Sequence, residues 1–261
     1  MKKIDIYRFL LILICISSFF ACKENTLQTE ERITDSPSGM AKVKVFNYSP
    51  TAPNFNIFNG VAKLVGAATS TNDTVDIGIP YKKFFPDGSG VYNLVAPGNF
   101  SADLIVPKSS AVQPNAKILS QNISLVANKA YSLYVTDTLT RTSIVVVEDD
   151  LTPVEIGKSG IRFANMMLGT DLTELKLSTT LTDANGNTST VMVPVQPVIF
   201  KQVSPFVVVS SGNFVATVSA VNKNATDLKL SFSAVSGKKY TVYIRGYKAQ
   251  TNAEIGTTVN Y

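Results

Sequence analysis

The stretch that sets the fold is Leu228-Lys229-Leu230-Ser231-Phe232-Ser233-Ala234, in which apolar and polar residues alternate without a break. Because successive side chains of a β-strand point to opposite faces, this alternation predicts a strand with one face in a core and the other in water. Shorter stretches with the same period are Lys42–Phe46, Tyr131–Val135 and Glu174–Leu177. No window shows the apolar spacing of a helix, so we predict an all-β protein.

Turn sequences separate these stretches at short intervals. Four of them combine residues that tolerate the backbone of tight turns: Pro86-Asp87-Gly88, Ala96-Pro97-Gly98-Asn99, Asn185-Gly186 and Ser211-Gly212-Asn213. Many short strands joined by such turns are typical of β-sandwiches and small barrels. We therefore expect an Ig-like or Greek-key β-sandwich architecture.

The chain contains one pattern twice. Three pairs of segments match in the same order, about 110 to 118 residues apart: Val43–Asn47 with Ile161–Asn165, Val95–Ala102 with Val209–Ala216, and Ser124–Val135 with Ser233–Ile244. This regular spacing indicates duplication of a whole domain. We predict two tandem β-sandwich domains, at residues 41–156 and 157–261, on either side of a polar junction.

The first residues have the pattern of a secretory signal peptide. A basic start precedes an apolar run from Phe9 to Phe20, which ends at Ala21-Cys22. A Cys directly after such a cleavage site resembles the lipobox of bacterial lipoproteins, although Phe19 and Phe20 depart from its usual residues. We predict a signal peptide at residues 1–21, lipidation of Cys22, and a flexible tether at residues 22–40.

This segment also determines where we expect the protein to be. Lys23-Glu24 partly resembles the charged surface-export signal of Bacteroidetes lipoproteins. We therefore expect an outer-membrane protein that its lipid holds on the membrane, at the cell surface or, alternatively, on a periplasmic leaflet. Ordinary secretion and a membrane-spanning anchor are the other interpretations, but the apolar run falls short of the roughly 20 residues that span a bilayer.

Composition excludes several classes of function. The chain has no histidine and no tryptophan, and its 2 cysteines are Cys15, inside the predicted signal peptide, and Cys22. Ser-His-Asp and Cys-His nucleophiles and cysteine metal sites are therefore impossible in the mature protein. We predict a non-catalytic protein with no catalytic residues, no cofactor and no metal. Its basic residues are scattered, which argues against nucleic-acid binding.

Four segments of the first repeat have counterparts in a known family. Lys42–Pro53 resembles the motif RVVNASPDAP, Leu94–Phe100 resembles LPAGTYTV, Val126–Tyr131 resembles LEAGKAYTV, and Glu148–Pro153 resembles DDLSPP. These motifs follow one another in the bacterial extracytoplasmic domain-of-unknown-function family 4397, which the first repeat resembles. The second repeat is a weaker match, because Met166-Met167-Leu168-Gly169 replaces the Ser-Pro-x-Ala-Pro element. The resemblance implies a surface β-sandwich and no catalytic residue.

Two acidic segments are candidate calcium sites. Glu148-Asp149-Asp150 is the only acidic run, and calcium prefers carboxylate oxygens; the alternative is a solvated strand end. Asp183–Ser189 superficially resembles a calcium loop, but Gly186 stands fourth rather than sixth, and Pro194 occupies the place of the bidentate Glu. We interpret the second segment as the turn of a hairpin between Leu181 and Val191, and we predict a metal at neither.

One predicted loop, Tyr81-Lys82-Lys83-Phe84-Phe85, combines aromatic and basic side chains. Exposed aromatic residues beside lysine are typical of surfaces that anchor a protein or glycan partner. The alternative is that Phe84 or Phe85 closes one end of a sandwich core.

Each repeat also has two tyrosines that are three residues apart on a predicted strand. These pairs are Tyr131 with Tyr134 and Tyr240 with Tyr243. An odd spacing places the two side chains on opposite faces of a strand. We expect the first of each pair to pack in a core and the second to face water.

These observations predict a lipid-anchored envelope protein that acts by binding or adhesion, with a protein or glycan partner that the sequence does not identify. Loops of a sandwich can vary without harming its core, and free strand edges can add a partner's strand. One alternative is a structural or accessory subunit of a pilus or outer-membrane complex, in which residues 206–209 or 255–259 donate or accept a strand. The other is a glycan-binding module of an uptake system.

Overall fold

The computed structural model describes residues 39–66, 75–182, 185–219 and 226–260. The predicted signal peptide, Cys22, most of the predicted tether and Asp183 of the calcium-like loop lie outside these residues. The contacts of the chain group Ser38–Tyr261 into one compact unit. In the described part of the chain, no helix is long and apolar enough to cross a bilayer, and the helical structure is a 3-10 turn at Leu139–Arg141.

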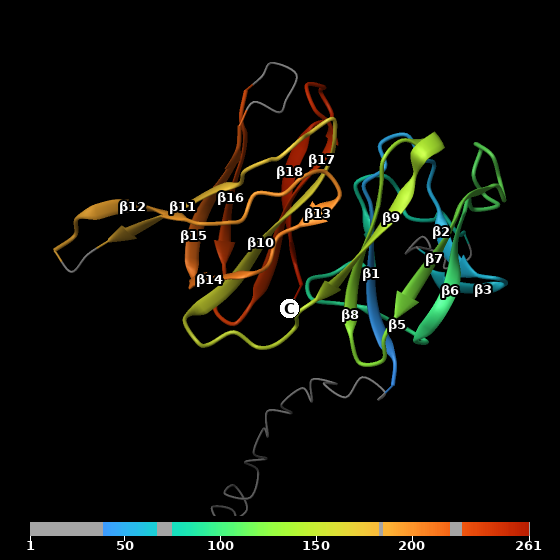
Figure 1. Cartoon of the computed structure of the whole chain (residues 1–261), viewed down its shortest axis with the longest axis horizontal. Helices are drawn as coiled ribbons and strands as arrows, with labels where there is room; N and C mark the ends of the chain where they lie inside the picture. Colours follow the sequence, from blue (N-terminus) through green and yellow to red (C-terminus); the bar gives the residue numbers. More distant parts are fainter. Residues whose placement is uncertain (1–38, 67–74, 183–184, 220–225, 261) are drawn as a thin grey trace, which may run out of the picture. The chain divides into compact units, whose positions relative to one another are not determined.

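The first sandwich is built from two sheets, drawn from blue to green in Figure 1. One sheet has the order β4-β1-β8-β9, with β5 also paired to β1, and the other has the order β3-β2-β6-β7. The strands are β1 (Ala41–Asn47), β2 (Asn56–Asn59), β3 (Ala62–Val65), β4 (Phe84–Phe85), β5 (Asn93–Val95), β6 (Gly98–Ile105), β7 (Lys117–Leu125), β8 (Ala130–Thr136) and β9 (Ser143–Asp149).

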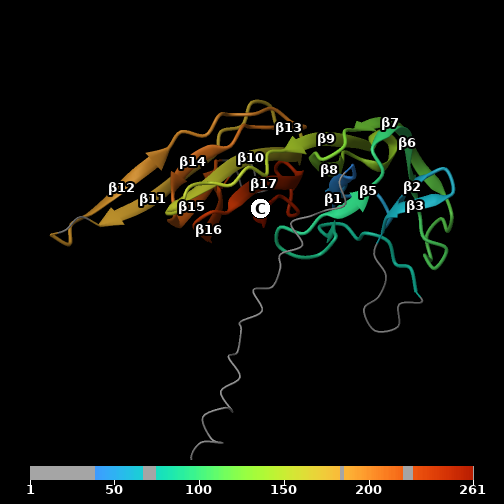
Figure 2. The same ribbon diagram turned by 90° about the horizontal axis from the view of Figure 1, so that it is seen from below.

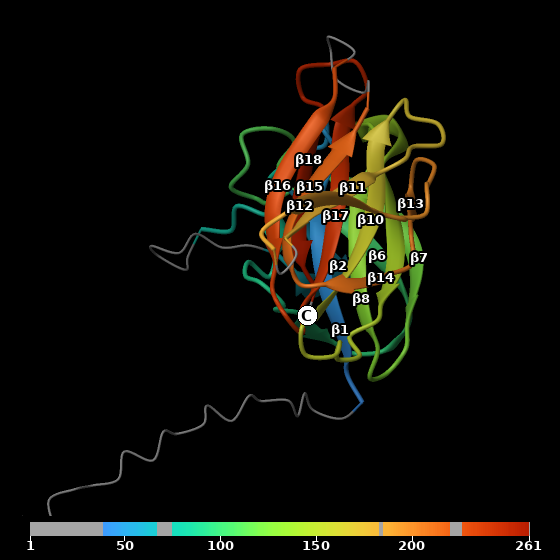
Figure 3. The same cartoon turned by 90° about the vertical axis from the view of Figure 1, so that its left-hand side faces the viewer.

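The second sandwich repeats this arrangement strand for strand. Its sheets have the orders β13-β10-β17-β18, with β14 also paired to β10, and β12-β11-β15-β16. Figure 3 looks onto this sandwich, with β15 and β16 in front of the sheet that holds β17. The strands are β10 (Lys158–Leu168), β11 (Lys176–Thr182), β12 (Thr188–Val193), β13 (Gln202–Val203), β14 (Val207–Ser210), β15 (Gly212–Val218), β16 (Leu228–Ala234), β17 (Lys239–Tyr247) and β18 (Glu254–Val259).

The register of the strands confirms the duplication. In each sandwich the first strand pairs in parallel with its eighth, so that Phe46 lies opposite Tyr134 and Ala164 lies opposite Tyr243. The expected all-β fold of two tandem sandwiches is therefore confirmed, as is the hairpin between Leu181 and Val191, where β11 pairs antiparallel with β12.

The two copies also keep the same buried hydrogen bonds. The Asn47 side chain donates to the carbonyl of Ile79 (2.9 Å), and Asn165 donates to the carbonyl of Val198 (3.3 Å). The amides of Val126 and Val235 donate to the hydroxyls of Tyr131 and Tyr240, respectively. Since a buried polar group without a partner is costly, these pairs explain why Asn and Tyr recur at these positions.

Each sandwich has its own apolar core between its two sheets. The first core includes Val43, Val45, Leu104 and Tyr131, and the second includes Ile161, Phe163, Phe214 and Tyr240. The first tyrosine of each pair thus packs in a core, as the sequence predicts.

Candidate functional site

The predicted partner-binding loop of the first sandwich contacts the second sandwich. Lys82 forms an ion pair with Glu254 of β18. The backbone carbonyl of Lys82 also accepts a hydrogen bond of 3.0 Å from Nη1 of Arg245 on β17. The contacts of Lys82 are therefore intramolecular, with the second copy of the repeat.

The other residues of the loop have different surroundings. Phe85 is partly buried and packs on the core of the first sandwich, in line with the alternative interpretation of this loop. Phe84 packs against apolar side chains of both sandwiches. Tyr81 is half-buried, and Lys83 is exposed. That Tyr81–Phe85 binds an external partner stays a prediction, and Lys83 is the side chain of this loop most open to one.

The equivalent lysine of the second sandwich contacts the first sandwich. Lys201 lies just before β13, as Lys82 lies just before β4, and both have a positive φ of about 70° (68° and 72°). Nζ of Lys201 donates a hydrogen bond of 2.9 Å to Asp137, which follows β8. The two copies thus contact each other through equivalent loops, as the halves of a symmetric dimer do.

Aromatic side chains of both sandwiches form an apolar cluster at this interface. Its buried members are Phe46, Tyr48, Tyr134, Ala164 and Met166, with Phe84, Val145, Val147, Val203 and Tyr243 packed against them. Ring centroids are 4.8 Å apart for Phe46 and Tyr134, and for Tyr48 and Tyr243. Aromatic pairs at this distance add to the gain from apolar burial.

The expectation that Tyr134 faces water is therefore wrong. Tyr134 does lie on the opposite face of β8 from Tyr131, but the second sandwich covers that face and leaves the side chain no exposed surface. Tyr243 is half-buried for the same reason.

A buried ion pair joins the sandwiches beside the aromatic cluster. The guanidinium of Arg162 on β10 contacts the carboxylate of Asp149 on β9, with side-chain exposures of 3% and 0%. Asp149 also accepts hydrogen bonds of 2.7 Å from Tyr92 and Ser132, and Nε of Arg162 donates to Thr241 (2.8 Å). Since the two charges contact each other and both groups have further hydrogen bonds, they are tolerated in an interior that would otherwise reject them.

Lys44 is the counterpart of Arg162 in the first sandwich. It has no exposed surface, and its Nζ donates a hydrogen bond of 2.7 Å to the carbonyl of Gly88. Burial lowers the pKa of Lys44 from 10.5 to about 8, against the opposing attraction of Asp149 and Asp87. The folded protein therefore releases this proton more readily than the unfolded chain does.

This difference predicts an unusual pH dependence of stability. Between pH 8 and 10.5 the unfolded chain binds more protons at Lys44, so the free energy of unfolding should rise with pH, by at most about 3 kcal/mol. Above about pH 10 the trend should reverse. Burial raises the pKa of Tyr48 and Tyr134, and raises that of Tyr81 to about 12, so the unfolded chain loses these protons first.

Urea unfolding at intervals of pH measures this dependence. A maximum of stability between pH 9 and 10.5 is expected for the natural protein, and the Lys44→Met variant should lack the rise that precedes it. A free energy of unfolding that falls steadily from pH 8 upward would contradict the burial of a charged Lys44.

Each carboxylate of the acidic run at the end of β9 forms an ion pair with a basic side chain of the protein. Glu148 pairs with Lys129 at 2.7 Å, Asp149 pairs with Arg162, and Asp150 pairs with Lys239 at 2.7 Å. The hydrogen bond from Lys239 lowers the pKa of Asp150 to about 2. Within the described residues, no group of three or more Asp, Glu, His or Cys side chains could hold a metal ion.

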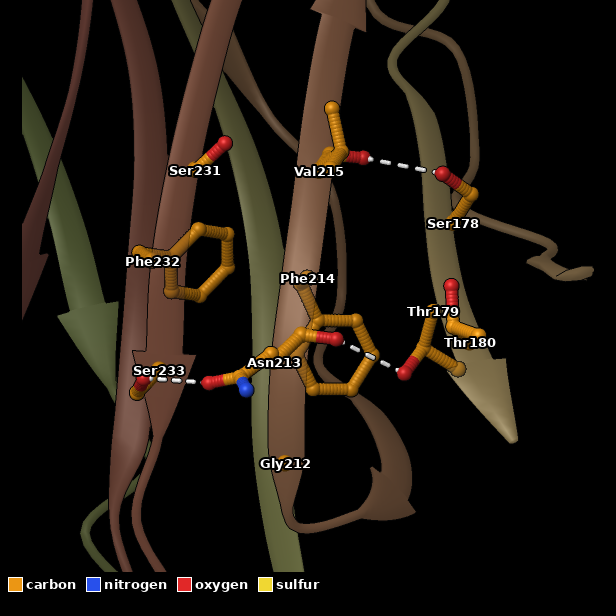
Figure 4. Close-up of a pocket in the computed structure, with 10 residues that line it drawn as sticks. All are labelled: Ser178, Thr179, Thr180, Gly212, Asn213, Phe214, Val215, Ser231, Phe232 and Ser233. Carbon is orange, nitrogen blue, oxygen red and sulfur yellow. Dashed lines mark hydrogen bonds between the residues drawn. The ribbon is translucent and has the colours of Figure 1, made fainter. Parts of the chain in front are cut away.

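The outer sheet of the second sandwich carries an open hollow of about 710 Å³, which Figure 4 shows. Ser178, Val215 and Ser231 lie opposite one another on β11, β15 and β16. Asn213 lies in the next outward row and accepts a hydrogen bond of 2.5 Å from Ser233. The lining is completed by Thr179, Thr180, Gly212, Phe214 and Phe232. Small hydroxyl and amide side chains leave the surface hollow and uncharged.

A hollow with the same position lies on the first sandwich. It is lined by Asn99, Phe100, Ser101, Asn122, Ile123 and Ser124, all on β6 and β7. Asn99 lies opposite Ser124 on these strands, as Asn213 lies opposite Ser233 on β15 and β16. The repeats thus keep both the sheet and an uncharged hollow at the same register position.

Sequence reasoning missed these hollows. Their polar residues follow the ordinary alternation of a strand with a wet face, and nothing in that alternation distinguishes a hollow from a flat surface. The Gly-Asn-Phe triplet at Gly98 and Gly212 was the available signal, because its Asn lies in both linings.

No curated protein matches this chain. Solved structures with similarity to it include a candidate cell adhesion protein from Bacteroides uniformis (11% identity, TM-score 0.24, 85% of this chain and 98% of that chain). A second candidate cell adhesion protein comes from Bacteroides fragilis (10% identity, TM-score 0.22, 86% of this chain and 98% of that chain). Another similar solved structure is that of CBMbc, of family CBM26, from Eubacterium rectale Amy13K in complex with maltoheptaose (10% identity, TM-score 0.21, 82% of this chain and 96% of that chain).

The family model for a domain of unknown function, DUF4397, matches residues 41–171. The match covers all strands of the first sandwich and continues through β10, and it amounts to half of the 261 residues. It confirms the resemblance carried by the motifs of the first repeat. The chain belongs to the DUF4397 family.

Proposed function

We propose that this chain is a non-catalytic binding protein of the cell envelope, anchored by a lipid on Cys22 and exposed at the cell surface. Its proposed ligand is a neutral, hydroxyl-rich polymer, which means a polysaccharide. The observation that carries this proposal is the recurrence of an uncharged hollow at one register position on both sandwiches.

The chemistry of the hollows supports a polysaccharide. Ser, Thr and Asn side chains both donate and accept hydrogen bonds, as sugar hydroxyls do. Val215, which is 42% exposed, offers an apolar surface to the carbon face of a sugar ring. Neither lining contains a charged side chain, so an anionic or cationic ligand would find no counter-charge there.

The absence of ionisable groups from both linings also supports binding without catalysis. Hydrolysis of a glycosidic bond needs a pair of carboxyl groups beside the bond, and neither lining holds one. A polymer long enough to reach both hollows would gain affinity from binding two sites on one chain.

The test uses bacterial cells that carry the full-length protein and a panel of fluorescent neutral polysaccharides. We expect one or more members of the panel to bind these cells. Val215→Arg combined with Ser124→Arg should abolish this binding, because each arginine fills one hollow with a large charged side chain. Val235→Arg is the matched control, since Val235 is 58% exposed and lies outside both linings.

Two further readouts separate anchoring from binding. Cells with Cys22→Ala should lose the protein from their envelope, and protease added to intact cells should remove the folded domains of the natural protein. Binding that persists in the double arginine variant, or natural cells that bind no member of the panel, would overturn the polysaccharide proposal. Survival of the domains until the outer membrane is opened would overturn surface display.

A further inference from the structure

The free edges of the four sheets differ in how well they are protected. An exposed strand edge can pair with another chain, and proteins block it with charged residues, bulges or short strands. The edge strands β3, β7 and β16 carry Lys63, Lys117 and Lys229, and β9 and β18 carry Glu148 and Glu254. The edge strands β4, β5, β13 and β14 span no more than four residues.

The strand β12 is the exception among the described edges. Its six residues, Thr188–Val193, include no charged residue and no proline, and its register with β11 has no bulge. Among the described strands, β12 pairs with β11 on one side only, and β11 has no other partner beyond Thr179. Figure 2 shows the hairpin of β11 and β12 running past the rest of its sheet.

Apolar side chains lie exposed along this hairpin. Leu181 is 48% exposed, Val191 is 40% exposed and Met192 is 56% exposed. The equivalent edge of the first sandwich is different, because β3 has four residues, a bulge in its register, and Lys63 paired with Asp76 at 2.8 Å. Both copies of the repeat thus have this hairpin, but its edge strand is protected only in the first copy.

We propose that β12 pairs antiparallel with β12 of a second copy of this chain. A strand that pairs antiparallel with itself about a two-fold axis offers the same donors and acceptors from both sides, so the edge is complementary to its own copy. An uncharged strand brings no like charges together, and the two exposed hairpins would shield each other's apolar side chains. The two four-stranded sheets would become one sheet of eight strands.

This contact closes on itself. The described residues of each chain include one such edge, and pairing occupies it, so the expected product is a dimer and not a fibre. The contact leaves both polar hollows accessible, since β12 contributes no residue to either lining. The inference therefore goes beyond the proposed binding function and does not depend on it.

Single cysteines test the pairing in cells that make the full-length chain. The chain has 2 cysteines, Cys15 and Cys22, so a new cysteine in β12 has no natural thiol in the folded body to compete with it. We expect mild oxidation to convert most of one variant, among Ser189→Cys, Thr190→Cys, Val191→Cys and Met192→Cys, to a disulfide-linked dimer. One position should dominate, because a two-fold axis brings one residue opposite its own copy.

Two controls keep the result interpretable. Lys229→Cys places a thiol on β16, the opposite edge of the same sheet, and should stay monomeric. Val191→Lys, added to the best cross-linking variant, gives β12 the charge that other edges carry and should abolish the dimer without unfolding the protein. Cross-linking no stronger than that of Lys229→Cys would overturn the proposal, and so would a cross-linked product whose mass includes a different protein.

Discussion

Replacing Arg162 with methionine is expected to lower the free energy of unfolding by about 3–5 kcal/mol. Methionine fills much of the volume of arginine, so the loss would come chiefly from charge. Asp149 has no exposed surface in its side chain, and without Arg162 its carboxylate would stay buried and lose the cation that contacts it directly. Tyr92 and Ser132 would still donate hydrogen bonds, but neither carries a positive charge.

Chemical unfolding of the purified protein measures this loss. Lys229→Met is the matched control, because Lys229 is exposed on β16 and the same change there should alter the free energy by less than about 0.5 kcal/mol. Adding Asp149→Asn to Arg162→Met should restore part of the stability, since a neutral amide is less costly to bury than an unpaired charge. A variant Arg162→Met as stable as the natural protein would mean that the two sandwiches are not joined at this pair.

The sequence predicted the strands and the duplication because both rest on local patterns. Alternation at Val43 and Val45 shows which side chains share a face, and the matching segments of the repeats place Asn47 with Asn165 and Tyr131 with Tyr240. These residues have the same hydrogen bonds in both copies. A pattern of period two therefore carries enough information for the fold of each sandwich.

The same pattern could not predict what covers the second face of each strand. Alternation places Lys44 and Tyr134 opposite the core, but it does not tell whether water or another domain meets them. Both are fully buried. The second sandwich covers Tyr134, whereas Lys44 contacts Phe84 and Gly88 of its own sandwich. A signal was present, since Phe46 and Tyr48 follow each other on a face that was expected to be wet, where large aromatic side chains are uncommon.

The candidate site was harder to predict for a related reason. The sequence predicts a binding loop at Tyr81–Phe85 because it combines aromatic and basic residues, and these residues do make contacts, but largely within the chain. The hollows are made of Ser, Thr and Asn, which are ordinary on a solvated strand face. The sequence repeats match Asn99 with Asn213 and Ser124 with Ser233, but only the three-dimensional register shows that each Asn lies opposite its Ser.

Replacing Phe46 with alanine is expected to lower the free energy of unfolding by about 3–5 kcal/mol and to weaken the coupling between the two sandwiches. Phe46 has no exposed surface and lies in the cluster shared by both, with its ring near those of Tyr48, Phe84 and Tyr134. Its equivalent in the second sandwich is Ala164, so the interface receives a large side chain from one copy and a small one from the other. The cavity left by alanine therefore opens between the sandwiches and not inside either core.

Phe214→Ala provides the matched comparison. Phe214 is equally buried, but it belongs to the core of the second sandwich alone. While the interface is intact, the first sandwich should lose stability when Phe214 is replaced, because the two sandwiches unfold together. In a Phe46→Ala background the first sandwich should respond less to Phe214→Ala, because the ion pairs of Asp149, Asp137 and Glu254 remain but the apolar contact between the sandwiches is weakened.

Hydrogen exchange of the backbone amides in β8 and β17 follows the two sandwiches separately. We expect equal protection in the natural protein and a shared loss with Phe214→Ala. In the Phe46→Ala background, the further loss caused by Phe214→Ala should be larger in β17 than in β8. The distinction matters for the proposed function, because two hollows bind one polymer more tightly when the interface holds them at a fixed separation. If Phe214→Ala leaves β8 unaffected even in the natural background, the sandwiches are independent, and the buried cluster does not couple them.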